Sequence, residues 1–373
     1  MDIKSVLKKS LKVLGYILGV LVLFAVMVIA FINVHPTFGD SPSDESMKRI
    51  QASDHYADGK FHNLDPTSVM TASDDEDGYV TEFFFPPDDK NPQEPLPSEK
   101  IDPSKIKDGT FTWMGHASVL TKTGGITILT DPVYNSASPL PIGGKPFELS
   151  NPLRIEDLPD IDVIVISHDH YDHLEYQGVK ELACSVDQFF VPLGVKAHVM
   201  YWGVEENRII EMDWYETTTY KGVEFTLVPA RHFSGRGITN GGSTLWGGWV
   251  FTSDTHNVFF SGDSGYLDEF KVIGSKYGPF DIAFIDSGAY NEAWANVHMM
   301  PEESVQASID VQAKTYLPIG WSRYDLAPHY WDDPIIRATK AAADQNVTIT
   351  TPLIGQTFTL ADLPQSRWWE ALR

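Results

Sequence analysis

The sequence predicts an α/β layered sandwich with helices on its outer faces, preceded by one membrane-spanning helix. Two observations support this prediction. Near the amino end, the run from Leu14 to Val34 contains no charged side chain. From about Lys105 onward, short β-rich runs alternate with Gly, Pro and Asp turns and with helical segments. Such alternation favours sheets covered by helices, and the 42% hydrophobic content is typical of a globular chain.

The apolar run 14–34 is long enough to cross a bilayer, because 21 helical residues span about 30 Å. Residues 1–13 carry four lysines and one aspartate, so the positive-inside rule places this basic tail in the cytoplasm and the rest of the chain on the extracytoplasmic side. A cleaved signal peptide with a weak site at Val28-Ile29-Ala30 is the alternative. Secretory apolar cores usually run about 7–15 residues, so we expect an uncleaved, single-pass anchor.

Residues 35–104 are acidic and contain prolines, with an acidic cluster at 74–77. This composition predicts a solvated spacer between the membrane and a domain that covers 105–373. Part of the spacer is expected to dock on the domain, since the three aromatic residues Phe83-Phe84-Phe85 would be unusual if all were exposed.

Net charge and cysteine content narrow the possible ligands of this protein. The formal net charge of −23 disfavours a protein that binds the phosphates of nucleic acid. Cys184 is the single cysteine, so no intrachain disulfide and no thiolate zinc cluster can form. Any metal must therefore be held by histidine and carboxylate side chains.

Several predicted strands are followed directly by a histidine or an aspartate. Strands that deliver such residues at the same end predict a site on one rim of a sheet. The strands and the residues that follow them are 126–130 before Asp131, 162–167 before His168, 223–229 before Ala230-Arg231-His232, 257–262 before Asp263, and 281–285 before Asp286. Helices are expected at about 174–184, 301–313 and 334–344.

The segment His168–His173 reads HDHYDH and has the composition of a metal site. His168 and His170 are two apart, so on an extended strand end both imidazoles point to one side. Asp172 and His173 follow where the chain turns into a helix and offer an oxygen and a nitrogen to a second position. Imidazole and carboxylate suit zinc, iron or manganese. A solvated histidine-rich loop is the alternative. His232 and Asp263, each at the end of a predicted strand further along the chain, argue against it.

These motifs resemble those of the metallo-β-lactamase superfamily, and within it the branch of N-acyl-phosphatidylethanolamine-hydrolysing phospholipase D and its bacterial relatives. The likeness covers about 54–355 and includes the segments Trp113–Ser118, Leu129–Pro132, Phe190–Gly194 and Phe260–Tyr266. The resemblance implies an αββα sandwich with a two-metal centre. It assigns one metal to His168, His170 and His232, a second metal to Asp172 and His173, and a bridging position to Asp263.

One ligand that the resemblance implies is missing. The family carries a histidine in an Ile-His-Trp-Gly segment, where this chain reads Pro318-Ile319-Gly320-Trp321. Asp172, His173 and Asp263 with a shared hydroxide still make four contacts, enough for a tetrahedral zinc. We therefore expect two divalent ions, with zinc the first candidate and the second position the weaker one. His329 is a candidate replacement, and Asp325 a less favoured one.

Five further residues are candidates for the surroundings of the metals. Asp131 is predicted to hydrogen-bond a ligand histidine, although it could equally cap a turn. His116 is placed with it outside the ligand shell. His298 resembles a family histidine near the substrate phosphate. Tyr171 and His329 are further candidates for the pocket.

The predicted function is a membrane-anchored metal-dependent hydrolase. A metal-bound hydroxide would attack the substrate, with Asp172 and Asp263 orienting it and taking up protons. The resemblance favours a phosphodiesterase acting on a phospholipid-like substrate or a small phosphodiester. A lactonase and a phosphomonoesterase on the same centre are the alternatives. A non-catalytic binding module stays open because of Gly320.

Overall fold

The computed structural model describes residues 3–71, 86–140 and 143–372, which fall into two units, 1–38 and 39–373. The first unit is built on helix α1 (Ile3–Val34). From Leu7 onward this helix is long and apolar enough to cross a membrane, which makes it a candidate span. The predicted docking of Phe83-Phe84-Phe85 concerns positions outside the described residues.

The second unit contains a seven-stranded sheet in the order β15-β3-β4-β5-β6-β7-β8. Strands β15, β3, β4 and β5 pair antiparallel, whereas β5, β6, β7 and β8 run parallel. The strands are β3 (Thr110–Trp113), β4 (Val119–Thr123), β5 (Ile126–Thr130), β6 (Val163–Val165), β7 (Gln188–Pro192), β8 (Ile209–Met212) and β15 (Thr357–Thr359).

A six-stranded sheet has the order β14-β13-β12-β11-β10-β9. Its strands are β9 (Thr217–Tyr220), β10 (Val223–Val228), β11 (Gly248–Thr252), β12 (Asn257–Phe260), β13 (Ile282–Asp286) and β14 (Tyr316–Ile319). Because β11 is antiparallel to both β10 and β12, and β12 to β14 are parallel, β10, β12 and β13 all point the same way.

The main core lies between the two sheets, and side-chain alternation explains it. On β6, Val163 and Val165 join this central core together with Phe225 and Phe284 of the other sheet. Ile164 points to the opposite face and joins the core beneath the helices. All three side chains of β6 are fully buried, as expected for a strand covered on both faces.

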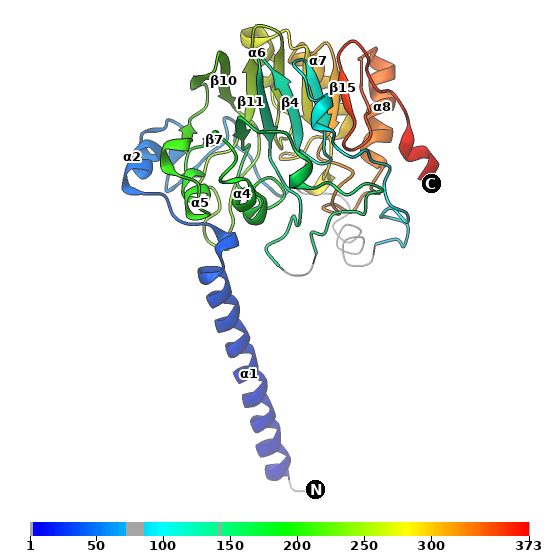
Figure 1. Ribbon diagram of the computed structural model, residues 1–373. Coiled ribbons are helices and arrows are strands. Elements are labelled where there is room, and N and C mark those ends of the chain that lie inside the picture. Colours follow the sequence, from blue (N-terminus) through cyan, green and yellow to red (C-terminus); the bar gives the residue numbers. More distant parts are fainter. Residues whose placement is uncertain (1–2, 72–85, 141–142, 373) are drawn as a thin grey trace. The chain divides into compact units, whose positions relative to one another are not determined.

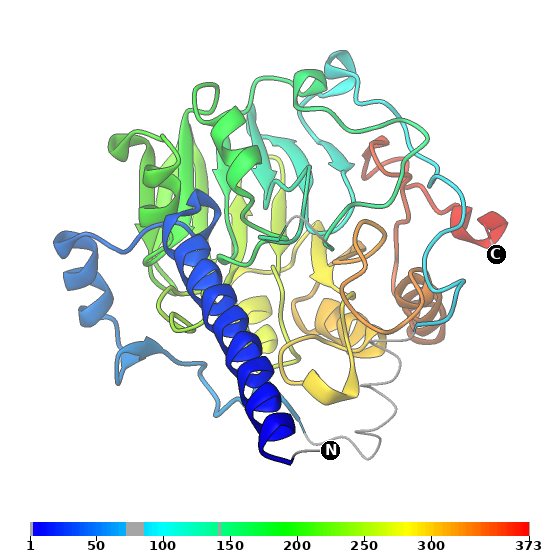
Figure 2. The ribbon, with the colours of Figure 1, turned by 90° about the horizontal axis from the view of Figure 1, so that it is seen from below.

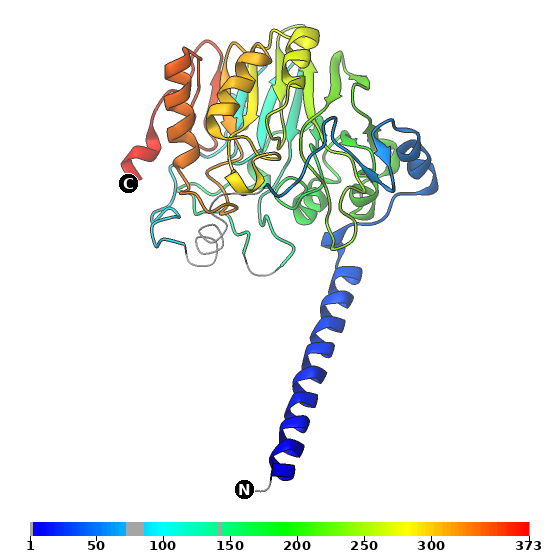
Figure 3. The same ribbon diagram turned by 180° about the vertical axis from the view of Figure 1, so that it is seen from behind.

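Helices cover both outer faces, so the predicted αββα sandwich is confirmed. Helices α4 (Tyr176–Leu182) and α5 (Lys196–Tyr201) pack on the seven-stranded sheet, on the near side in Figure 1. Helices α6 (Glu269–Tyr277), α7 (Pro301–Asp310) and α8 (Asp333–Gln345) pack on the six-stranded sheet, on the near side in Figure 3. Figure 2 looks along the strands and shows the two helix layers on opposite sides.

From residue 44 onward, described parts of the predicted spacer pack on the domain. They form α2 (Asp44–Ala52) and a small hairpin of β1 (Tyr56–Ala57) and β2 (Lys60–Phe61). In α2, the Ser46 hydroxyl donates to the buried carboxylate of Glu211 at 2.8 and 2.6 Å, and Arg49 pairs with Glu216 at 2.7 Å. Part of the chain that composition describes as a linker is therefore built into the fold.

Candidate metal centre

The candidate centre lies where strands of both sheets end on one rim. Asp131 follows β5, and His168 follows β6 of the seven-stranded sheet. His232 follows β10, and Asp263 follows β12 of the six-stranded sheet. The two rims meet, because the Asp263 carboxylate lies 3.0 Å from the ring of His173. The strand ends of the two sheets therefore bring together residues that are 90 positions apart in the chain.

Three imidazoles converge to form the first group. The Nδ1 atom of His170 lies 2.9 Å from Nε2 of His168 and 3.2 Å from Nε2 of His232. The outer Nδ1 atoms of the other two rings are held from behind: Ser167 Oγ lies 2.9 Å from that of His168, and the Val297 carbonyl lies 2.9 Å from that of His232. Such outer contacts fix the tautomer and the direction of a metal-binding ring.

A second group combines Asp172, His173 and His116. The ring of His173 is held by the buried Asp131, whose Oδ2 lies 2.7 Å from its Nδ1. Its Nε2 then faces Asp263 at 3.0 Å and Asp172 at 3.5 Å. His116 approaches from the turn between β3 and β4, and its Nε2 lies 3.1 Å from Asp172 Oδ2. The structure thus places His116 among atoms that could share one cation.

Asp263 lies between the two groups. Its Oδ2 is 4.0 Å from Nε2 of His168 and 3.9 Å from Nε2 of His232, in addition to the shorter contact with His173. The same carboxylate groups with His168 and His173 within the distances that one cation spans. Asp263 is therefore close to donors of both groups.

The site also contains a pair that sequence reasoning did not assemble. His298 has its Nε2 3.9 Å from Asp263 Oδ2, and its Nδ1 lies 3.1 Å from Asp286 Oδ2 at the end of β13. Asp286 is buried and also accepts hydrogen bonds from the backbone N–H groups of Ser264 and Gly288. The position of Asp286 at a strand end was visible in the sequence. Its partner His298 comes from a separate loop, so the pairing was not.

Asn63 is a second residue that sequence reasoning gave no role. Its side chain makes paired hydrogen bonds with the backbone of His232, accepting from the N–H at 3.0 Å and donating to the C=O at 2.8 Å. It therefore fixes the backbone that carries one member of the first group. The residue belongs to the predicted spacer, so no pattern near His232 pointed to it.

Burial and the charges of neighbouring groups set the protonation states in the centre. Burial lowers the pKa of His168 and of His232 well below the ordinary range, so both rings are neutral at pH 7. Burial also opposes a proton on His173, but the charges of Asp263 and Asp172 outweigh burial and raise its pKa well above the ordinary range. Although burial favours the neutral acid, nearby His173 holds the pKa of Asp172 and of Asp263 well below their usual values.

A divalent cation fits these donors. Nε2 of His173 is buried and finds no hydrogen-bond partner of suitable direction within the described ranges, although two carboxylate oxygens lie nearby. Three ring nitrogens of the first group also face one another at hydrogen-bond distance, and Asp263 Oδ2 lies about 4 Å from two of them. A cation satisfies both arrangements, because ligand histidines bind through a lone pair in the neutral state.

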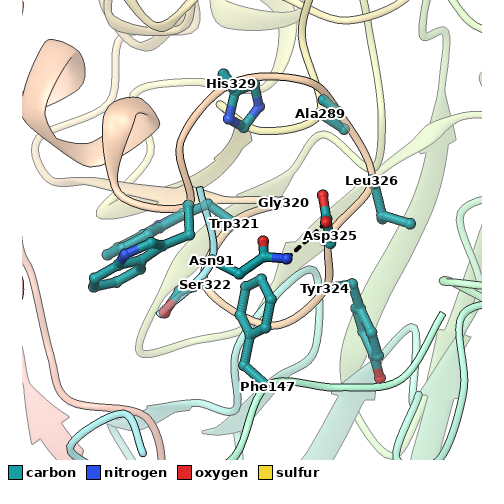
Figure 4. A pocket seen from close by; sticks show the side chains of 12 residues that line it. Asn91, Phe147, Ala289, Gly320, Trp321, Ser322, Tyr324, Asp325, Leu326 and His329 are labelled. Carbon is teal, nitrogen blue, oxygen red and sulfur yellow. Dashed lines mark hydrogen bonds between the residues drawn. The ribbon is translucent and has the colours of Figure 1, made fainter. Parts of the chain in front are cut away.

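Gly320 and His329 line a separate hollow beside this centre (Figure 4). His329 stacks on Tyr290 with ring centroids 4.4 Å apart, and its Nδ1 faces the Tyr330 carbonyl at 2.9 Å. Asp325 faces the same hollow, held by Asn91 at 2.8 Å. Neither of these two candidates belongs to the groups of donors that the described residues form around the centre.

Tyr171 points away from the converging donors. Its hydroxyl donates to the Arg236 carbonyl, and the Arg236 guanidinium lies 4.2 Å from the centre of its ring. Arg236 is buried and also donates to the Leu174 carbonyl at 2.8 Å. The structure therefore gives Tyr171 a packing contact with the loop that follows His232.

A cavity of about 300 Å³ opens at the candidate metal-binding donors. His170, Asp172, Asp263 and His298 form its polar floor. Its walls are mostly apolar and come from several parts of the chain, namely Val69, Met70, Phe233, Ala289, Trp294, Val297 and Leu326. Its volume and mixed lining are those of a site for a small or medium-sized organic ligand.

Comparison with known proteins gives three findings. A family model described as a beta-lactamase superfamily domain matches residues 127–321. An uncharacterised protein of Mycobacterium tuberculosis is 39% identical over 314 residues, covering 82% of this chain and 84% of the relative. The N-acyl-phosphatidylethanolamine-hydrolyzing phospholipase D 1 of Caenorhabditis elegans is 36% identical over 267 residues, covering 67% of this chain and 75% of that protein.

Solved structures show the same fold. The metallo hydrolase Igni18 of the archaeon Ignicoccus hospitalis superposes with a TM-score of 0.52 and 20% sequence identity. The superposition covers 67% of this chain and 97% of that one. The shared part is the layered α/β sandwich described above.

Proposed function

Because this chain belongs to the β-lactamase superfamily of metal-dependent hydrolases, we propose that it is a membrane-anchored phosphodiesterase acting on a phospholipid-like substrate. The bond to be cleaved is a phosphate ester: water adds to phosphorus, the ester P–O bond breaks, and the alcohol leaves with a proton. In a phospholipase D-type reaction the products are a phosphatidate and the headgroup alcohol.

The cavity over the donors supports the proposal most directly. A phospholipid combines an anionic phosphodiester with long apolar chains, and the cavity combines a polar floor with apolar walls. Met70 and Val69 at its edge are partly exposed, so the apolar surface continues outward. A small polar substrate would leave these walls in contact with water, which is unfavourable.

Two divalent ions, for which zinc is the first candidate, would be held by His168, His170 and His232 on one side and by Asp172 and His173 on the other, with Asp263 between. Such ions supply Lewis acidity toward a phosphoryl oxygen and lower the pKa of a bound water. Ligands limited to nitrogen and oxygen agree with this choice of metal.

Charged side chains of the site would orient the water and the substrate. Asp263 and Asp172 are ionised and line the cavity, so they can orient the attacking water by accepting its hydrogen bonds. His298 is a cation at neutral pH: burial works against its charge, but the hydrogen bond and charge of Asp286 raise its pKa to about 9. Its positive charge offsets the acidic surroundings where an anionic phosphate would bind.

The apolar helix α1 would keep the domain at its substrate. Its lysine-rich start, with Lys8, Lys9 and Lys12 in the first turns, supports a cytoplasmic amino terminus under the positive-inside rule. The hydrolase domain would then act on the extracytoplasmic side of the membrane.

Hydrolysis by the full-length chain in detergent, reconstituted with Zn²⁺, tests the proposal. We expect turnover of bis-(p-nitrophenyl) phosphate and release of the headgroup alcohol from an N-acylated phosphatidylethanolamine. The turnover rate of a His170→Ala variant should be at least about 100-fold lower than that of wild type. The substitution removes the ring nitrogen that faces both His168 and His232 in the first group.

Three other results would reject the proposal. Hydrolysis of a lactone series without any phosphodiester turnover would make the protein a lactonase. Turnover of p-nitrophenyl phosphate alone would make it a phosphomonoesterase. A metal-loaded protein inactive on all of these substrates would favour a binding module.

A further inference from the structure

The structure explains why position 320 carries no ligand. Gly320 has a φ of +82°, and a Cβ placed on it would lie 2.7 Å from Asp286 Oδ1. Its backbone also packs directly against Gly288. A Cβ placed on Gly288 would lie 1.9 Å from the Gly320 carbonyl oxygen. Asp286 and the glycine pair thus occupy the space from which a histidine side chain would have to start.

His116 is tied to that same stretch of backbone. Its N–H donates to the Trp321 carbonyl at 3.1 Å, and its own carbonyl accepts from the Gly320 N–H at 3.1 Å. The indole of Trp113 donates to the same carbonyl at 2.9 Å. The turn between β3 and β4 therefore runs beside Gly320 and is fixed to it by hydrogen bonds on both sides.

The backbone of His116 adopts a conformation that is costly for a side chain of this kind. Its φ is +49°, in the left-handed region that non-glycine residues rarely occupy. Backbone strain of this kind is found at sites where a side chain must be held in one direction. Here the side chain is directed inward, and the residue is only 3% exposed.

The ring of His116 ends among the donors of the second group. Its Nε2 lies 3.1 Å from Asp172 Oδ2, and the donor atoms of His116, Asp172 and His173 all lie within 4.8 Å of one another. The rings of His116 and His173 have centroids 5.0 Å apart and are inclined by 60°. Two imidazoles and a carboxylate are donors of the kinds that zinc sites use.

We propose that His116 is the nitrogen ligand that replaces the missing histidine at position 320. The second metal would then have four protein ligands, namely His116, Asp172, His173 and Asp263. Among the other histidines near the centre, His298 groups with His232 and Asp263 and is held by Asp286. The ring of His329 is stacked on Tyr290.

This inference rests on the proposed two-metal centre, and metal content tests it separately from activity. Full-length chain in detergent would be loaded with Zn²⁺, dialysed, and analysed by plasma mass spectrometry. We expect two zinc ions per wild-type chain and one for His116→Gln. The matched variants His298→Gln and His329→Gln should keep two.

The glutamine substitution separates a metal ligand from a residue that only positions Asp172. Its amide can still donate a hydrogen bond to Asp172, but it has no imidazole lone pair for a metal. If His116 is a ligand, the His116→Gln substitution should lower the affinity for the second zinc by more than about 100-fold. Competition with a chromophoric chelator would measure this affinity. Residues that only orient a ligand typically contribute about 10–100-fold when removed entirely.

A spectroscopic readout covers the case in which the variant folds poorly. Cobalt substituted into the wild-type second position should show the intense visible bands of a four-coordinate ion, and X-ray absorption should count two imidazoles there. His116→Gln binding two zinc ions with wild-type affinity would overturn the inference. One metal per wild-type chain, or loss of the second metal in His329→Gln instead, would overturn it as well, whether or not phosphodiesters are hydrolysed.

Discussion

Restoring the family histidine by Gly320→His should damage the protein instead of completing the metal site. At a φ of +82° any side chain costs about 1–2 kcal/mol relative to glycine. The new Cβ also lies 2.7 Å from Asp286 Oδ1, so that buried carboxylate must move. Moving it breaks its hydrogen bonds with Gly288 and His298, at about 1.5–3 kcal/mol for bonds to a charged group.

With two hydrogen bonds lost, the expected total is a loss of about 4–8 kcal/mol in the free energy of unfolding. Urea unfolding of the full-length chain in detergent, followed by tryptophan fluorescence, would measure it. Gly320→Ala is the matched control, since it introduces the same Cβ and the same φ without an imidazole. Most of the loss should already appear in the alanine variant.

The chelator competition assay gives a second readout for the same pair of variants. We expect no gain in the affinity for the second zinc in Gly320→His. We reason that Asp286, Gly288 and the backbone of Gly320 leave no room for a histidine side chain at position 320. A Gly320→His variant as stable as wild type, or one that binds the second zinc more tightly, would refute this reasoning.

Three further predictions concern the metals and the membrane. Asp131→Asn should lower metal affinity about 10–100-fold in isothermal titration calorimetry, because it disturbs the contact that orients His173; unchanged affinity would show that the contact is dispensable. On dialysis from pH 8 to pH 5 the second metal should leave before the first. The raised pKa of His173 lets a proton compete with the metal at higher pH, whereas burial lowers the pKa of His168 and His232 and delays that competition; metal content at each pH checks the order, and simultaneous loss would contradict it. Deleting residues 1–38 should move the protein from the membrane fraction to the soluble fraction, because it removes α1. Hydrolysis of bis-(p-nitrophenyl) phosphate should change less than about twofold, and membrane retention of the truncated chain would show a second anchor.

The sequence alone predicted the layers of the fold and most residues of the candidate site. Hydrophobic runs of strand length identified β5, β6, β10, β12 and β13, because their side chains are buried on both faces and leave a continuous apolar signal. The residues that follow each strand within a few positions are a local property of the chain. His168, His232 and Asp263 could therefore be proposed before any contact was known.

Contacts between distant segments were decided only by the tertiary structure. Asp286 meets His298, Asn63 meets His232, and His116 meets Asp172 because separate turns come together at one rim. The same holds for Gly320, which a sequence pattern records only as a missing ligand. That its Cβ position lies against Asp286, and that a histidine from another turn points toward the second group of donors, depends on how the two sheets pack. Periodicity and spacing report only local backbone geometry, whereas these pairings are set by packing.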